Sequence, residues 1–252
     1  ALVSSRGLGA AEYLLFYDGV DNACPPTSAI NAAGQWAALG APEIAKRKAA
    51  YARAVAADGV TRAQAIVDAW DPAKENFLAE LADAGKRRIY SSQQMAFNAL
   101  SDSMFYVDSD LKDDKVGKPA GLVMPTCDAP PCLDLVESQW AKRSKEHMRN
   151  NLVGFEKLLA GCGGANEGLG FDDLLRAVGA EQTVKNLEGA LAGARAALDA
   201  LKEPTFDDDL TKNPEGVKQL FLALRALAAV MKTELLSVLD LELPKEIQGD
   251  ND

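Results

Sequence analysis

Residues 217–238 read VKQLFLALRALAAVMKTELLSV, and their apolar residues recur at steps of three and four. The positions concerned are Val217, Phe221, Leu224, Leu227, Met231, Leu235 and Val238. Because an α-helix turns once in about 3.6 residues, this spacing aligns them along one helical face. Arg225 interrupts the apolar run, and a membrane span needs about 20 apolar residues in a row. The stretch therefore predicts a long core helix and not a transmembrane helix.

The rest of the chain repeats this helical pattern. Comparable apolar stripes run through 136–159 and 184–198, with a shorter one in 97–107. Further helices are expected at 4–17, 27–39, 43–57, 61–70 and 73–86, with Gly59 placed to end one of them. Alternating strand patterns are absent from the sequence, and alanine is abundant. The sequence predicts an all-α protein built from helical bundles.

One long segment lacks this periodicity. Residues 109–132 contain several glycines and prolines. A loop of this length in a compact domain is usually functional or a boundary. We therefore predict an N-terminal helical domain at 1–108, a connection at 109–132, and a C-terminal helical bundle at 133–252.

The composition argues against several classes of function. The chain has 252 residues, with 27 Lys and Arg against 37 Asp and Glu, and a formal net charge of −10. Nucleic-acid binding needs clustered Lys and Arg, so nucleic acid is not expected as a partner. His147 is the one histidine, which excludes sites that need two or three imidazoles.

The four cysteines lie in predicted loops. Cys127 and Cys132 enclose Asp-Ala-Pro-Pro, Cys24 begins a Cys-Pro-Pro turn, and Cys162 lies in Gly-Cys-Gly-Gly. Four cysteines allow three pairings, of which we favour Cys127–Cys132 with Cys24–Cys162. Four free thiols are the alternative interpretation, and the lack of a Cys-x-x-Cys pair disfavours zinc. Disulfides indicate an oxidising compartment.

Residues 5–16, SRGLGAAEYLLF, contain the chain's most distinctive carboxylate. Glu12 lies among apolar residues, and Gly9, three positions earlier, shares its helical face. A carboxylate in such surroundings is either paired or functional. The alternative is a surface glutamate beside a core stripe.

This stretch resembles the signature helix of the imelysin-like family of bacterial envelope proteins. Other segments resemble the family in the same order, namely 21–24 with 27–31, 112–117, 136–138 with 143–144, 168–175 and 249–252. The resemblance implies two four-helix-bundle-like domains with a site between them, the first domain being incomplete in this chain. It also implies export to the periplasm or the cell envelope, in many members as lipoproteins, and a role in iron acquisition. The founding member is classed as a metallopeptidase of family M75.

The chain departs from the family at one position. The family motif Gly-x-His-x-x-Glu aligns with residues 7–12, where Gly9 replaces the histidine. His147 belongs to a different predicted helix. Because zinc hydrolases seldom use carboxylates alone, the departure argues against peptidase activity.

A ligand site around Glu12 is still expected. Glu12 would serve as a metal ligand, since hard cations such as ferric iron accept carboxylate oxygens. Arg and Ser side chains would instead suit an anion. The site residues that we predict are Arg6, Gly7, Gly9, Glu12, Asp113, Lys115, Ser144 and Asp172. Structural alternatives are a helix-start carboxylate for Asp172 and a solvated loop pair for Asp113 with Lys115.

The function expected from these features is a non-catalytic envelope protein that binds a ligand or partner in iron or metal acquisition. The implied cofactor is iron or another metal ion. The implied partner is an envelope metal-uptake component or an outer-membrane receptor, and a segment before Ala1 could carry a lipid anchor. The alternatives are a metallopeptidase-like hydrolase and a structural or docking module.

Overall fold

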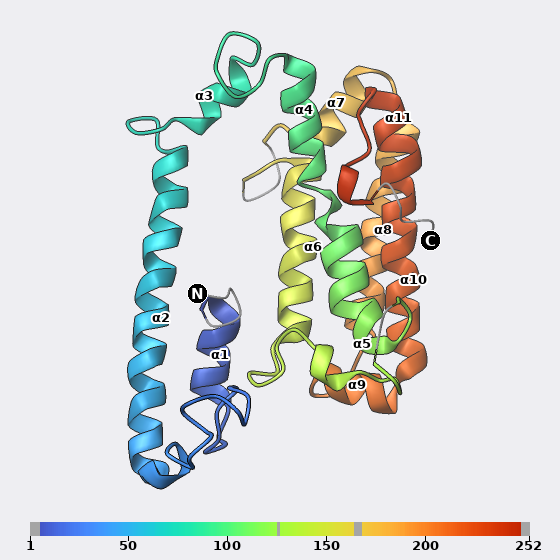
Figure 1. Ribbon diagram of the computed structural model, residues 1–252. Helices are drawn as coiled ribbons and strands as arrows, with labels where there is room; N and C mark the ends of the chain where they lie inside the picture. The colour runs from blue at the N-terminus through green and yellow to red at the C-terminus, as the bar shows by residue number, and fades with distance from the viewer. Residues whose placement is uncertain (1–5, 125–126, 164–167, 248–252) are drawn as a thin grey trace. The chain divides into compact units, whose positions relative to one another are not determined.

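The structure, a computed structural model, describes residues 6–124, 127–163 and 168–247, and its regular elements are all helices (Figure 1). The longer helices are α1 (Leu8–Phe16), α2 (Gly40–Trp70), α4 (Gln93–Asp102), α6 (Ser144–Ala160), α8 (Glu181–Asp199) and α10 (Pro214–Val230). The shorter ones are α3 (Phe77–Ala82), α5 (Lys118–Ala120), α7 (Phe171–Ala177), α9 (Phe206–Lys212) and α11 (Leu236–Leu239). The 3₁₀ turns are η2 (Ala37–Leu39), η3 (Phe105–Val107), η5 (Leu133–Leu135) and η7 (Lys245–Ile247), and the π-helical segments are η4 (Asp108–Gly117) and η6 (Met231–Leu235). The predicted all-α class is confirmed.

The chain divides into two compact units, 1–79 and 80–252. This division differs from the predicted one around 109–132. The predicted N-terminal helical domain at 1–108 and C-terminal bundle at 133–252 stay a prediction. None of the described helices is long and apolar enough to cross a membrane.

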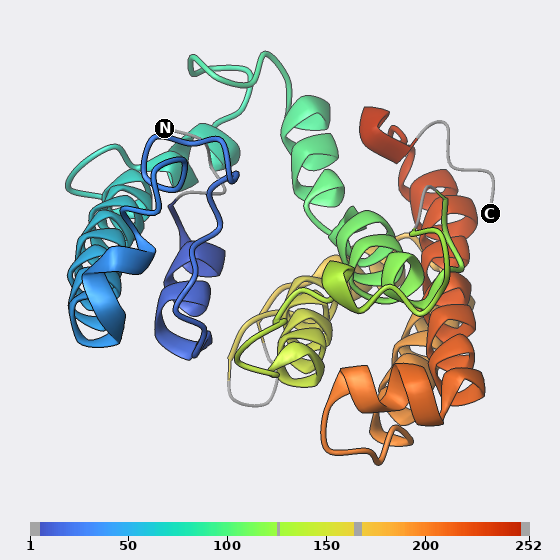
Figure 2. The ribbon, with the colours of Figure 1, turned by 60° about the horizontal axis from the view of Figure 1, so that its bottom comes forward.

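The second unit contains the main hydrophobic core. In it α10 packs against α8, as both views show, and against η4 (Figures 1 and 2). Leu224, Leu227 and Met231 are completely buried on α10 and η6. The predicted stripe is therefore confirmed as the core face, and only its last member, Val238, is exposed.

The start of the predicted connection is helical instead of irregular. Residues 108–117 form η4, whose Leu111 and Val116 are buried in the core. Gly117 belongs here because a Cβ would lie 2.5 Å from Val123 Cγ2, so close packing demands a glycine. Pro119 lies at the second position of α5, which follows η4 without a break. The expectation of a loop at these residues was wrong, because Gly117 serves close packing and Pro119 lies within helical backbone.

The first unit pairs α1 with α2, joined mostly by turns at 17–39. The helices predicted at 43–57 and 61–70 are one helix, and Gly59 lies inside it with open space around it. A mid-helix glycine costs only about 1 kcal/mol, which neighbouring residues offset. The prediction that Gly59 ends a helix was wrong, as was the helix at 27–39, of which only 37–39 is helical.

Candidate functional site

Helix α1 carries the residues aligned with the Gly-x-His-x-x-Glu motif. Gly7 precedes it with φ of +94°, a conformation that glycine adopts without strain. Gly9 is exposed, and a Cβ placed on it would meet nothing within 4 Å. Glu12 is half-buried three positions later. Packing therefore leaves room at Gly9 for the side chain that this chain lacks.

Arg6 lies just before α1 and is exposed. The pKa of Asp58 on α2 is lowered, chiefly by its hydrogen bond with Arg62 and in a smaller part by the charge of Arg6. The start of α1 therefore presents a cation toward the middle of α2.

A lysine of α2 is buried against α1. Lys48 is 8% exposed, and its Nζ donates a hydrogen bond to the Gly19 carbonyl at 2.5 Å. The same Nζ lies 5.2 Å and 4.9 Å from the ring centres of Tyr13 and Tyr17, whose rings stack 5.0 Å apart. Aromatic faces and a carbonyl attract a cation, so they offset the cost of removing this ammonium from water.

Tyr17 connects α1 to the turn that follows it. Its hydroxyl donates to Asp21 Oδ1 at 2.8 Å, and this hydrogen bond is the main cause of its raised pKa. Burial raises the pKa of Tyr13, with a further contribution from the charge of Asp21. The end of α1 thus fixes the position of an acidic side chain.

The turns between α1 and α2, with the first residues of α2, line an open pocket of about 620 Å³. Asn22 and Asn31 bind each other there, with Asn22 Nδ2 donating to Asn31 Oδ1 at 2.8 Å. Asn31 Nδ2 also donates to the Cys24 carbonyl at 2.9 Å, and Trp36 Nε1 donates to the Val20 carbonyl at 2.7 Å. Sequence reasoning missed this pocket, although its signal was present in the asparagines of 21–24 and 27–31.

The π-helical segments of the second unit enclose a buried ion cluster. Lys112 Nζ lies 3.1 Å from Asp108 Oδ1 and 3.1 Å from Asp113 Oδ1. Lys232 Nζ lies 2.7 Å from Asp108 Oδ2. Lys112 and Asp108 are almost completely buried, and the two cations balance the two carboxylates. Asp113 is therefore part of a buried helix cluster, and the alternative of a solvated loop pair with Lys115 was wrong.

Lys115 belongs to a second cluster of polar side chains, which lies beside α6. Its Nζ lies 2.8 Å from Asn151 Oδ1 and 3.0 Å from Glu137 Oε1. The other carboxylate oxygen of Glu137 lies 3.4 Å from His147 Nδ1. The structure thus brings together the 112–117 and 136–138 segments, along with the chain's one imidazole.

Ser144 has a structural partner at the start of α6. It is buried, and its Oγ accepts a hydrogen bond from the Ser138 backbone N–H at 3.3 Å. Ser138 Oγ in turn accepts from the Arg143 N–H at 3.1 Å. These bonds hold the chain where it enters α6.

Asp172 also has structural partners. It forms an ion pair with Arg176 and accepts a hydrogen bond from the Asp173 N–H at 2.9 Å. These contacts agree with the alternative of a helix-start carboxylate. Gly170 lies against the Leu159 carbonyl at the far end of α6. Because 17 helical residues span about 25 Å, Asp172 and Ser144 do not share a small ligand.

The described residues do not fit a resident metal centre. Among them, no three His, Cys, Asp or Glu side chains gather where a metal ion would be held. Gly9 offers no imidazole, and Glu12 alone supplies one carboxylate. The role of Glu12 as a metal ligand stays a prediction.

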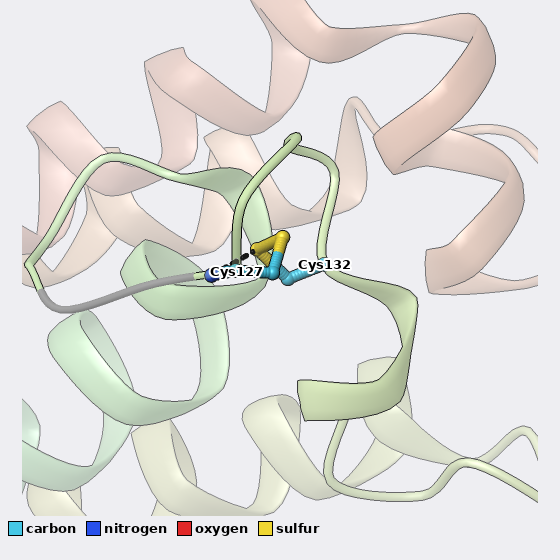
Figure 3. The surroundings of a disulfide bond; sticks show 2 residues. All are labelled: Cys127 and Cys132. Carbon is cyan, nitrogen blue, oxygen red and sulfur yellow. Dashed lines mark hydrogen bonds between the residues drawn. A yellow bond between two sulfur atoms is a disulfide. The ribbon is translucent and has the colours of Figure 1, made fainter.

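The predicted disulfide between Cys127 and Cys132 is confirmed (Figure 3). The Cα atoms lie 5.6 Å apart, and the Cys132 N–H donates to the Pro119 carbonyl at 2.8 Å, which ties the loop to α5. Cys24 and Cys162 are exposed free thiols in different units. The predicted Cys24–Cys162 bond is not formed in the structure.

The family model described as imelysin, peptidase M75, matches residues 2–232. The chain belongs to the imelysin family. The match contains every segment of the resemblance except 249–252, which also lies outside the described residues. Searches of curated proteins and of solved structures give no match.

Proposed function

We propose that this imelysin-family chain is an exported, non-catalytic protein of the bacterial cell envelope that binds a ligand or partner in iron or metal acquisition. Family membership supports export. The observation that carries the non-catalytic assignment is Gly9, which supplies no imidazole at an exposed and uncrowded position of α1.

Glu12 is the side chain that we propose for ligand contact. It is half-buried on α1, the helix that carries the motif. A carboxylate supplies the oxygen donor that ferric iron and other hard cations prefer. Arg6, exposed at the start of the same helix, provides a cation for an anionic part of the ligand.

Thermal unfolding with added ferric iron, zinc, copper or haem tests the ligand role. A ligand at about 100 times its dissociation constant stabilises the native state by about 2.7 kcal/mol, so a rise in Tm is expected. Glu12→Gln should reduce that rise. Glu75→Gln, an exposed glutamate of the same unit, is the matched control and should respond like the wild type. No rise with any of the four additions would contradict a metal or haem ligand.

A peptidase assay tests the non-catalytic assignment separately. With an unfolded protein as substrate, we expect no chelator-sensitive cleavage. Chelator-sensitive cleavage that is lost in Glu12→Ala would overturn the assignment and support the metallopeptidase alternative.

A further inference from the structure

The pocket lined by the turns that join α1 to α2 has no role in the function proposed above. Its lining comes from the turns at 20–37 and the first residues of α2, and Glu12 is not among the lining residues. Its volume of about 620 Å³ lies in the range of small-molecule sites, about 300–1,000 Å³. The pocket therefore has the size of a ligand site and needs an assignment of its own.

Among the described residues that line this pocket, Asp21 is the one that carries a charge. The nearest cations along the chain are engaged elsewhere, Lys46 and Arg47 with Glu43 and Lys48 with the Gly19 carbonyl. Residues 7–45 contain Glu12, Asp18, Asp21 and Glu43 and no Lys, Arg or His. Asp21 lines the pocket, with Oδ1 held by the Tyr17 hydroxyl at 2.8 Å. An ionised carboxylate has about four acceptor sites, so Asp21 retains capacity for a donor from a ligand.

The amide and indole donors among the side chains that line the pocket already have partners within the protein. Asn22 Nδ2 and Asn31 Nδ2 donate to each other's oxygens at 2.8 Å and 3.1 Å, and Trp36 Nε1 donates to the Val20 carbonyl. The same bonds fix the turn, so the lining is formed before a ligand arrives. A ligand that brings N–H donors or a positive charge fits this lining better than an anion.

Trp36 adds an aromatic surface to the lining. Indole is the aromatic group that attracts cations most strongly. The same unit already holds an ammonium group against aromatic faces, because Lys48 lies over Tyr13 and Tyr17. A carboxylate and an indole on one pocket are the groups that recognise an organic ammonium ion.

We propose that this pocket binds a small organic cation, with Asp21 as the counter-charge and Trp36 as the aromatic wall. Ligands of this class are primary and quaternary ammonium compounds with a short carbon chain. The assignment is independent of Glu12 and of metal binding.

Isothermal titration calorimetry of the full chain with choline and with butylamine tests the proposal. Saturable binding of one or both is expected at one site per chain. The uncharged choline analogue 3,3-dimethylbutan-1-ol has nearly the same shape, and it should bind at least about tenfold more weakly because it lacks the charge.

Two variants locate the site, and a third is the matched control. Asp21→Asn keeps an acceptor for the Tyr17 hydroxyl and removes the charge, so it should weaken binding about tenfold. Trp36→Leu should weaken it by a similar factor. Asp18→Asn removes an exposed charge from the same turn without touching the lining and should bind like the wild type.

Three results would overturn the proposal: no binding of either amine at millimolar concentration, equal binding of the neutral analogue, or equal weakening by Asp18→Asn and Asp21→Asn. Thermal unfolding of each variant shows that it is folded. The metal titration of Glu12→Gln is a separate measurement, so the failure of either proposal is distinguishable from the failure of the other.

Discussion

Gly9 differs from the family motif by a single side chain, and its surroundings do not explain the loss. Nothing lies within 4 Å of a Cβ placed there, whereas the equivalent position on Gly117 would lie 2.5 Å from Val123. Two glycines of one chain thus have opposite constraints. Packing requires Gly117 and permits a larger residue at Gly9.

Restoring the histidine is therefore expected to leave the fold intact. In Gly9→His, the unfolding free energy should change by no more than about 0.5 kcal/mol, as is usual for an exposed site. The control Gly9→Ala adds a side chain that cannot bind a metal. We therefore expect a larger zinc-dependent rise in Tm in Gly9→His than in Gly9→Ala or the wild type, because a His and a Glu three apart share a helical face. Zinc titrations of both variants and of the wild type, followed by thermal unfolding, measure this. Loss of the native fold in Gly9→His would show that the space at this position is not available.

Tyr106 makes the stability of the fold fall as the pH rises into the alkaline range. Burial raises the pKa of Tyr106 from 10.0 to about 12, and its hydroxyl donates to the Asn151 carbonyl at 2.5 Å. The folded state holds the phenolic proton more tightly than the unfolded state, so this stabilisation is full below about pH 10 and is lost as the pH rises toward about 12. Urea unfolding of the wild type and Tyr106→Phe at pH 8, 10 and 11 checks the prediction.

At pH 8 the unfolding free energy of Tyr106→Phe should be about 1 kcal/mol lower than that of the wild type, because one hydrogen bond is missing. Between pH 8 and 11, the unfolding free energy of Tyr106→Phe should fall by less than that of the wild type. Equal pH dependence of the two proteins would contradict a role for Tyr106.

At the scale of elements, the two faces of α10 make different contributions. Leu224 is completely buried and Leu222 is 39% exposed, two positions away on the same helix. Leu224→Ala should lower the unfolding free energy by about 2–5 kcal/mol, since it removes core contacts and leaves a cavity. Leu222→Ala should change it by about 0.5 kcal/mol or less. Chemical denaturation of both variants measures the difference, and similar losses would contradict the assigned core face.

The sequence predicts elements well where burial follows the helical period. The 217–238 stripe succeeds for this reason, because Leu224, Leu227 and Met231 all face the core. It fails at 109–117, where a glycine suggests a loop. There Gly117 serves close packing against Val123 and against Phe221 of α10, and a contact with another helix leaves no local pattern.

The sites depend even more on residues distant in sequence. Lys112 shares Asp108 with Lys232, and the latter is supplied by η6, more than a hundred positions later. The pocket depends on the pairing of Asn22 with Asn31, a pairing that arises only when the turn folds. The sequence pattern singled out the segments at 21–31 and 112–117, but the partners of their side chains are known only from the folded structure.

At the scale of the whole molecule, the number of reactive thiols shows which cysteines are free and which are joined in disulfides. Protein unfolded in guanidinium without reductant should expose two reactive thiols, Cys24 and Cys162, because Cys127 and Cys132 are joined. Reduction should raise the count to four. A count of zero before reduction would show that Cys24 and Cys162 also form a bond, as the sequence predicted.

The π-helical geometry of η4 gives this segment an unusual tolerance of length. Its hydrogen bonds span five residues instead of four, so its turns are wider than those of an α-helix. Deleting one residue before Lys115 would let the segment relax toward an ordinary α-helix without breaking the chain's path. Because the wide turns hold about one residue more than α-helical turns do, the side chains beyond η4 would keep their present directions. The chain would enter α5 as it does now, and η4 would absorb a change in length without a change in direction.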